Sequence, residues 1–172
     1  MYLIATIYFL MYINIYSEYI FISKIMRLTT FSDYCIRTLI YLGLNQSKRV
    51  TISDVAGAYA ISENHLKKVV NFLGQQGCVE TIRGKGGGMR LARSPQDINI
   101  GALLFAAEGY EGLLECVDGP SSCCIQPACN LIDILVKAQA AMFAVFDKYT
   151  LADLLCQEER LGRILLQPLA DK

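Results

Sequence analysis

The stretch 62-SENHLKKVVNFLGQQGCVETIRGKGGGMRLA-92 determines the fold that we predict for this chain. Its first half repeats apolar residues with a helical period, which predicts a helix that Ser62 caps and Gly77 ends. The apolar side of this helix carries Leu66, Val69, Val70 and Leu73. The second half holds two short β-type runs around a glycine-rich tip, which is typical of a hairpin. A helix with one polar face followed by a basic hairpin predicts a helix-turn-helix with a wing.

Two further helices precede this stretch. Residues 30–46 carry apolar side chains at spacings of three and four, and Thr30 with Asp33 resembles the start of a capping box. Thr51 and Asp54 have the same spacing and begin a second helix. A short break after this second helix provides the turn of the helix-turn-helix.

The net charge of zero hides a basic half and an acidic half. Residues 26–97 carry ten Lys and Arg against five Asp and Glu, whereas residues 98–172 carry five against ten. An excess of positive charge favours a polyanionic partner such as double-stranded DNA. We therefore expect a DNA-binding domain over residues 26–97 and a different task for residues 98–172.

Polar and basic side chains on these elements predict how DNA would be bound. The polar face of the third helix would enter a groove, and the wing tip would contact phosphates, because its glycines allow close backbone approach. The expected DNA-binding residues are Ser53, Asn64, His65, Lys67, Lys68, Asn71, Arg83, Lys85 and Arg90. The same tip does not fit a nucleotide-binding P-loop, which requires strand–loop–helix order and a Lys-Ser/Thr pair.

The acidic half is predicted to hold a helix that Asn99 caps, a cysteine-rich loop and a long helix over residues 127–149. Pro127 and Cys129 would lie in the first turn of the long helix, where the helix dipole favours a thiolate. An apolar stripe along this helix consists of Leu131, Ile134, Leu135, Ala138, Ala141, Met142, Val145 and Phe146. The stripe is larger than one small domain covers easily, so we predict a dimerisation helix and a homodimer, with an ordinary core helix as the alternative.

Four of the seven cysteines lie within 115-ECVDGPSSCCIQPACN-130. A disulfide is disfavoured beside a DNA-binding domain, which works in a reducing compartment. Zinc is disfavoured because the loop has no CxxC pair and the single histidine lies on the third helix. Three spaced thiols, those of Cys116, Cys123 and Cys129, suit an iron–sulfur cluster with one other ligand. Free thiols, or a redox switch that uses Cys123 and Cys124, remain the alternative.

Four segments taken together resemble the Rrf-type winged-helix transcriptional regulators: 26-MRLTTFSDY-34, 83-RGKGGGMRL-91, 123-CCIQPAC-129 and 149-YTLADLL-155. The resemblance covers residues 26–166. It implies a mainly α-helical protein with a small β-hairpin wing, which acts as a homodimeric repressor and not as an enzyme. It also implies that Cys116, Cys123 and Cys129 hold the cluster, with [4Fe–4S] favoured and [2Fe–2S] possible.

One branch of this family senses nitric oxide, and its fourth cluster ligand resembles an aspartate near the N-terminus of the partner subunit. Asp33 matches that position, whereas Ile132 stands where another branch has a ligand histidine. The interval between the first two loop cysteines is longer than usual for the family, which leaves Cys124 as a substitute for Cys123. The implied function is repression of nitrosative-stress genes that ends when nitric oxide attacks the cluster. A thiol-based redox sensor or a regulator of iron–sulfur status is the alternative.

The first 25 residues differ in composition from the rest. Residues 1–17 carry no charge, and 18 of the 25 are Phe, Tyr, Met, Ile, Asn or Lys, which A/T-rich codons encode. We interpret residues 1–25 as the product of a start site placed too far upstream, with a membrane anchor as the alternative. The resemblance begins at Met26, which agrees with this interpretation. For residues 26–172 we expect a cytoplasmic protein without a membrane partner.

Overall fold

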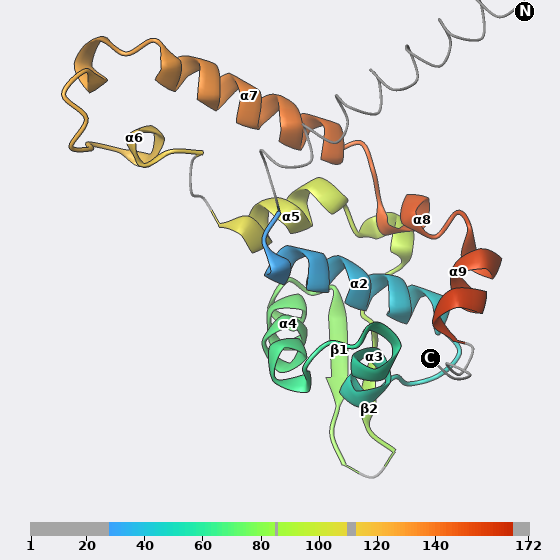
Figure 1. The fold of residues 1–172 in the computed structure, drawn as a ribbon. Helices are drawn as coiled ribbons and strands as arrows, with labels where there is room; N and C mark the ends of the chain where they lie inside the picture. The colour runs from blue at the N-terminus through green and yellow to red at the C-terminus, as the bar shows by residue number, and fades with distance from the viewer. Residues whose placement is uncertain (1–27, 85, 110–112, 167–172) are drawn as a thin grey trace, which may run out of the picture.

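The computed structural model describes residues 28–84, 86–109 and 113–166. The extension over residues 1–25 and the wing residue Lys85 lie outside these ranges. The described chain is mainly α-helical with one two-stranded antiparallel hairpin (Figure 1). No helix within the described ranges is long and apolar enough to cross a membrane.

The predicted helix-turn-helix and wing are both present. The elements are α2 (Thr30–Leu44), α3 (Ile52–Tyr59), α4 (Glu63–Gln75), β1 (Val79–Ile82) and β2 (Gly88–Leu91). A full capping box starts α3, because the Asp54 side chain accepts from the Thr51 amide (2.7 Å) while the Asp54 amide donates to the Thr51 hydroxyl (3.2 Å). The turn before α4 contains Ala60 in the left-handed region (φ 54°).

The start of α2 differs from the prediction by one residue. Thr29, and not Thr30, is the N-cap, and its hydroxyl accepts from the amide of Ser32 (3.2 Å). Asp33 is therefore not part of a capping box. Its carboxylate instead binds Arg37 one turn further along the helix (2.9 Å).

The second half of the chain starts as predicted and then departs from the prediction. After η1 (Pro95–Asp97), the Asn99 side chain accepts from the amide of Ala102 (2.8 Å) and caps α5 (Ile100–Glu108). The remaining elements are α6 (Glu115–Asp118), η2 (Gln126–Ala128), α7 (Leu131–Phe146), α8 (Leu151–Leu154) and α9 (Glu158–Leu165).

The long helix starts later than predicted. Pro127 lies in η2, and α7 begins at Leu131, so the helix has 16 residues and a length of about 24 Å. Cys129 ends η2 instead of lying in the first turn of α7. The predicted effect of the helix dipole on the Cys129 thiolate therefore loses its structural basis.

One core joins the two halves of the chain. Leu39 and Leu42 of α2 are buried together with the apolar stripe of α4 and with Leu103 and Leu104 of α5. Helices α5, α8 and α9 all pack against α2. The two predicted domains, residues 26–97 and 98–172, share one core. Their separation at residue 97 therefore stays a prediction about their functions.

Helix α7 leaves this body as an arm. Figure 1 shows its C-terminal end near α5 and α8, while its N-terminal end, with η2 and α6, projects far beyond α2. The arm is anchored by Phe143, whose ring packs edge-to-face on Phe105 of α5 (5.2 Å between centroids). No residue of α7 is buried.

Candidate nucleic-acid interface and cysteine loop

The face of α4 that was predicted to enter a DNA groove is exposed in the described part of the chain, and the ring of its His65 lies 6.2 Å from that of Tyr34. Leu66, Val69, Val70 and Leu73 are buried in the core, as their spacing predicts. The opposite face is solvent-exposed and consists of Asn64, His65, Lys67, Lys68 and Asn71. Ser53 is exposed in the first turn of α3. These six side chains are therefore accessible to a ligand, and their roles stay predictions.

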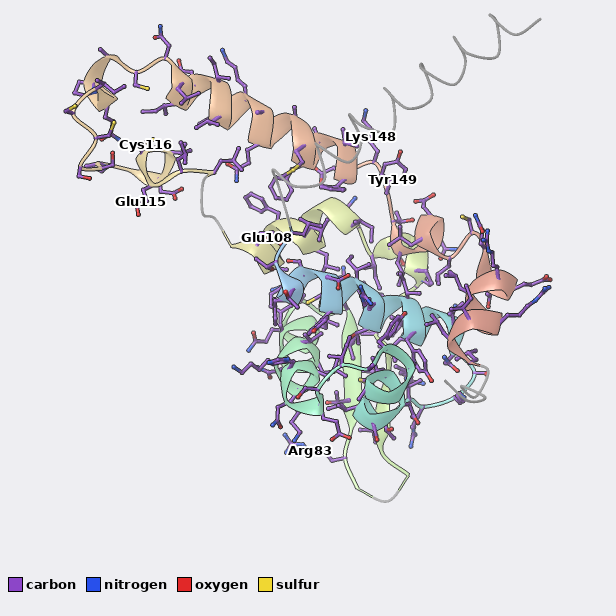
Figure 2. The ribbon with its side chains drawn as sticks, in the orientation of Figure 1. Arg83, Glu108, Glu115, Cys116, Lys148 and Tyr149 are labelled. Atoms are coloured by element: carbon purple, nitrogen blue, oxygen red, sulfur yellow. The ribbon has the colours of Figure 1, made fainter. Side chains whose placement is uncertain are left out.

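Two of the basic residues that were predicted to contact DNA from the wing, Arg83 and Arg90, lie in the described part of the chain, and their surroundings differ. Arg83 is exposed just after β1 (Figure 2). Arg90 of β2 lies directly opposite Glu80 of β1 and forms an ion pair with it. This partner offsets part of the positive charge of Arg90, which sequence reasoning did not anticipate.

Asp33 lies on α2 within a small set of contacts that reach the helix-turn-helix. Nε of Arg37 is 2.8 Å from Oδ2 of Asp33, and this hydrogen-bonded ion pair raises the pKa of Arg37. The same guanidinium lies over the ring of Tyr59 in α3, 5.6 Å from its centroid. Burial raises the pKa of Tyr59 to about 12, so its phenol stays neutral at physiological pH.

The N-terminus of α2 is also tied to the end of α5. Oε1 of Glu108 accepts from the amide of Thr29 (2.8 Å) and from its hydroxyl (3.2 Å). A carboxylate at a helix N-terminus is favourable because the first amides lack partners within the helix. Sequence reasoning missed Arg37 and Glu108. The four-residue spacing of Asp33 and Arg37 could have indicated the first, but no local pattern indicates the second.

The four loop cysteines are free thiols at the far end of the arm. Cys116 and Cys129 are half-buried, and Cys123 and Cys124 are exposed. Figure 2 shows Cys116 at the opposite end of α7 from Lys148 and Tyr149, and well separated from Arg83. A pocket of about 860 Å³ opens beside the loop, and Cys116 and Cys123 both line it, together with Leu113, Leu114, Glu115, Asp118, Ser121 and Ser122. Cys124 is not part of this lining.

The side chain of Gln126 organises the loop. Its Oε1 accepts from the amide of Ser121 (2.8 Å), and its Nε2 donates to the carbonyl oxygens of Gly119 (2.7 Å) and Cys116 (3.2 Å). Ser121 in turn accepts from the amide of Cys123 (3.3 Å). One glutamine therefore connects the segments that carry Cys116 and Cys123. Its role depends on contacts within an irregular loop, which sequence periodicity does not reveal.

The thiols of the loop are suitable ligands for an iron–sulfur cluster, but in the described residues they are not gathered into a metal site. Thiolates are the usual ligands of such clusters, and the described cysteines form no disulfide. However, among the described residues no three His, Cys, Asp or Glu side chains are close enough together to hold a metal ion. The described residues of a single chain therefore form no site that combines Asp33 with the loop cysteines. That a second subunit supplies the aspartate stays a prediction.

Comparisons with known proteins identify the family. The profile of the Rrf2 family, described as "Iron-dependent Transcriptional regulator", matches residues 28–157. The transcriptional regulator NsrR of Bacillus licheniformis is 43% identical over 142 residues, which cover 81% of this chain and 99% of that protein. NsrR of Bacillus subtilis is 44% identical, with coverage of 81% and 97%.

Solved structures agree with this result. IscR of T. potens superposes with a TM-score of 0.60 at 25% identity, covering 79% of this chain and 90% of that chain. CymR of B. subtilis, a cysteine regulator, gives a TM-score of 0.58 at 25% identity, with coverage of 75% and 95%. Members of the family are transcriptional regulators, so the chain is not an enzyme. From its fold, its matched residues and its relatives, the chain belongs to the Rrf2 family of transcriptional regulators.

Proposed function

We propose that this regulator is a homodimeric repressor in the cytoplasm whose binding to double-stranded DNA depends on an iron–sulfur cluster. A [4Fe–4S] cluster is favoured over [2Fe–2S], nitric oxide is the signal, and the repressed genes belong to the nitrosative-stress response. The observation that carries the proposal is the set of four free thiols on one loop in a chain that is 43% identical to a regulator named NsrR. The exposed neighbours Cys123 and Cys124 support the alternative, a thiol-based redox or iron–sulfur-status regulator.

In this proposal the residues of the chain have distinct tasks. Cys116, Cys123 and Cys129 bind iron as thiolates, and Asp33 of a second copy completes the site with a carboxylate oxygen. Carboxylate is a harder and weaker ligand for iron than thiolate, so the corner that it holds is the replaceable one. The bound cluster would supply the iron that nitric oxide attacks. Release of Asp33 would then change the position of α2, on which the helix-turn-helix packs.

Anaerobic purification tests the cluster. The protein started at Met26 should be brown, absorb visible light and contain iron and sulfide, and nitric oxide should bleach it and weaken DNA binding in a gel shift. Single Ser substitutions at Cys116, Cys123 and Cys129 should each lower the iron content, whereas Cys124→Ser should not. A colourless Cys124→Ser protein beside a brown Cys123→Ser protein would reverse the assignment. Colourless wild-type protein whose DNA binding responds to a thiol oxidant would favour the alternative.

The uncovered side of α7 supports the homodimer. Phe143 and Phe146 turn one side of the helix towards the body, and the other side exposes Leu131 (48%), Ile134 (60%) and Val145 (51%). Residues 134 and 145 are eleven apart, which places them on the same side of a helix. A row of exposed apolar side chains on a projecting arm matches what a second copy of the same arm would bury.

A substitution on this row tests the dimer. Ile134→Asp adds a charge to an exposed position, so it should leave the monomer folded, as judged by circular dichroism, and shift the sedimentation coefficient from that of a dimer to that of a monomer. Ala140→Asp is the matched control, because Ala140 is also exposed but its side chain points about 120° away from that of Ile134 around the helix axis. Dimers that persist in Ile134→Asp would contradict the assignment of this face.

A further inference from the structure

The segment between α2 and α3 runs along the wing. The amide of Val50 donates to the carbonyl of Met89 in β2 (3.0 Å), and the amide of Met89 donates back to the carbonyl of Val50 (2.7 Å). This reciprocal pair is the pattern of two antiparallel strands. Val50 is also buried, at 1% exposure. Strand β2 of the wing is therefore fixed to the residues that lead into α3.

Arg49 extends this connection from strand β2 to the tip of the wing. Nη1 of Arg49 donates to the carbonyl oxygen of Gly86 (2.8 Å), across 37 positions in the sequence. Gly86 lies in the loop between β1 and β2, where it has a positive φ of 75°. The hydrogen bond has a charged donor, which makes it stronger than one between neutral groups.

The glycines of the wing allow this close approach. A Cβ on Gly88 would lie 2.9 Å from the carbonyl oxygen of Val50 and 3.1 Å from Cβ of Arg49. A Cβ on Gly87 would lie 2.8 Å from the carbonyl oxygen of Gly84. Two of the tip glycines are thus required by packing against neighbouring backbone, and at Gly88 the neighbour is the segment that carries Arg49.

We propose that Arg49 is a positioning residue for DNA binding, which holds the wing tip at a fixed place relative to α3 and α4. A glycine-rich tip without an anchor has many conformations, and binding DNA would require the loss of that freedom. The hydrogen bond from Arg49 to Gly86 removes much of this conformational freedom before DNA binds. The inference rests on the proposed DNA interface, in which the wing contacts phosphates.

A double-mutant cycle separates this role from that of an ordinary phosphate contact. Binding is measured by fluorescence anisotropy on a labelled DNA duplex of mixed sequence, about three helical turns long, at low salt. Arg49→Ala in the wild-type background should weaken binding about fivefold to tenfold, the value of one hydrogen bond. In a background with Arg83→Ala and Lys85→Ala, the same substitution should cost less than about twofold, because the tip of the wing no longer has a charge to position.

Lys48→Ala is the matched control, because Lys48 is the exposed basic neighbour of Arg49. Its effect should be the same in both backgrounds. If Arg49→Ala costs the same factor in both backgrounds and lowers the salt slope by about one, Arg49 is a phosphate contact and the proposal is wrong. If the double wing substitution does not change binding, the wing contact in the proposed function fails, and the positioning role fails with it. If the double wing substitution weakens binding, but Arg49→Ala costs the same factor with and without it, the wing contact stands and only the positioning role of Arg49 is contradicted.

Amide hydrogen exchange without DNA gives an independent readout. The amide of Gly87 donates to the carbonyl of Gly84 (2.9 Å) in the tip that Arg49 anchors. Arg49→Ala should speed exchange at Gly87 at least fivefold, while Lys48→Ala should leave it unchanged. Unchanged exchange at Gly87 in Arg49→Ala would show that the tip does not depend on this side chain, and would overturn the proposal.

Discussion

Asp33→Asn separates the structural role of this carboxylate from a role as a cluster ligand. The structure shows what the side chain does within one subunit: it binds Arg37 at 2.8 Å, and both side chains are 44% exposed. Thr29 caps the helix, so the substitution removes no cap. Asparagine keeps the size of the side chain and loses its charge.

The structural cost of this substitution is small. An exposed ion pair four residues apart on a helix contributes about 0.3–0.5 kcal/mol, and a negative charge near a helix N-terminus adds about 0.3–1 kcal/mol. Arg37 keeps its position over Tyr59, 5.6 Å from the ring centroid. The free energy of unfolding should therefore fall by no more than about 1.5 kcal/mol, and the protein should remain folded at room temperature.

Against this small cost, a ligand role predicts a large change elsewhere. Asp33→Asn should keep a cluster, bleach at a different rate in stopped-flow absorbance with nitric oxide, and release DNA poorly in a parallel gel-shift titration. Arg37→Gln is the matched control: it removes the same ion pair, keeps the carboxylate and should bleach like the wild type. If Asp33→Asn gives the wild-type trace and the wild-type release, Asp33 has no role beyond its ion pair with Arg37.

Three further predictions concern the fold and the loop. Gly101→Ala should lower the free energy of unfolding, measured in urea, by about 1–3 kcal/mol, because the new methyl group would lie 2.6 Å from the backbone nitrogen of Asp147. Gly57→Ala is the control. A Cβ at Gly57 meets nothing within 4 Å, so this substitution should raise the free energy of unfolding by up to about 1 kcal/mol. Burial raises the pKa of the Cys35 thiol from 9.0 to about 12, so the stability that this neutral thiol supports is complete below pH 9 and is lost as the pH rises towards 12. Thermal unfolding across this range should show a shallower loss in Cys35→Ala. Gln126→Ala should speed hydrogen exchange at the Ser121 amide, which bonds to Gln126 at 2.8 Å, and should lower the iron retained after anaerobic reconstitution.

The elements with strong local signals were predictable from the sequence. The capping box of Thr51 and Asp54, the cap at Asn99 and the buried stripe of α4 all appear as their patterns predict. Ser62 stands at the N-cap of α4 as predicted, but its side chain makes no capping hydrogen bond. Two other errors occurred where neighbouring residues offer equivalent chemistry. Thr29 and Thr30 can both cap a helix, and the choice of Thr29 moves Asp33 out of the capping box. Pro127 suits the first turn of an α-helix or of a 3₁₀-helix, because neither needs its missing amide.

The candidate site was predictable only in part, for a physical reason. The exposed face of α4 follows from helical periodicity, since a helix that buries one side must expose the other. The cysteine loop has no such constraint, because its path depends on hydrogen bonds from Gln126 to backbone groups several residues away. The ion pair of Arg90 with Glu80 depends on the register of the hairpin, which residue types alone do not specify. The relation between Asp33 and the cysteines would depend on a second chain.

Contacts along α2 explain how events near its N-terminus could reach DNA. Phe31 packs edge-to-face on Phe72 of α4, with centroids 5.3 Å apart, and the ring of Tyr34 lies 6.2 Å from that of His65 on the exposed face of the same helix. Tyr34 directly follows Asp33, whose partner Arg37 lies over Tyr59 of α3. Packed side chains have little free space, so a rotation or shift of α2 would have to be accommodated by both helices of the helix-turn-helix. A ligand bond to Asp33 would therefore act on the element that already contacts both α3 and α4, and its loss could change DNA binding without any contact between the cysteine loop and the DNA.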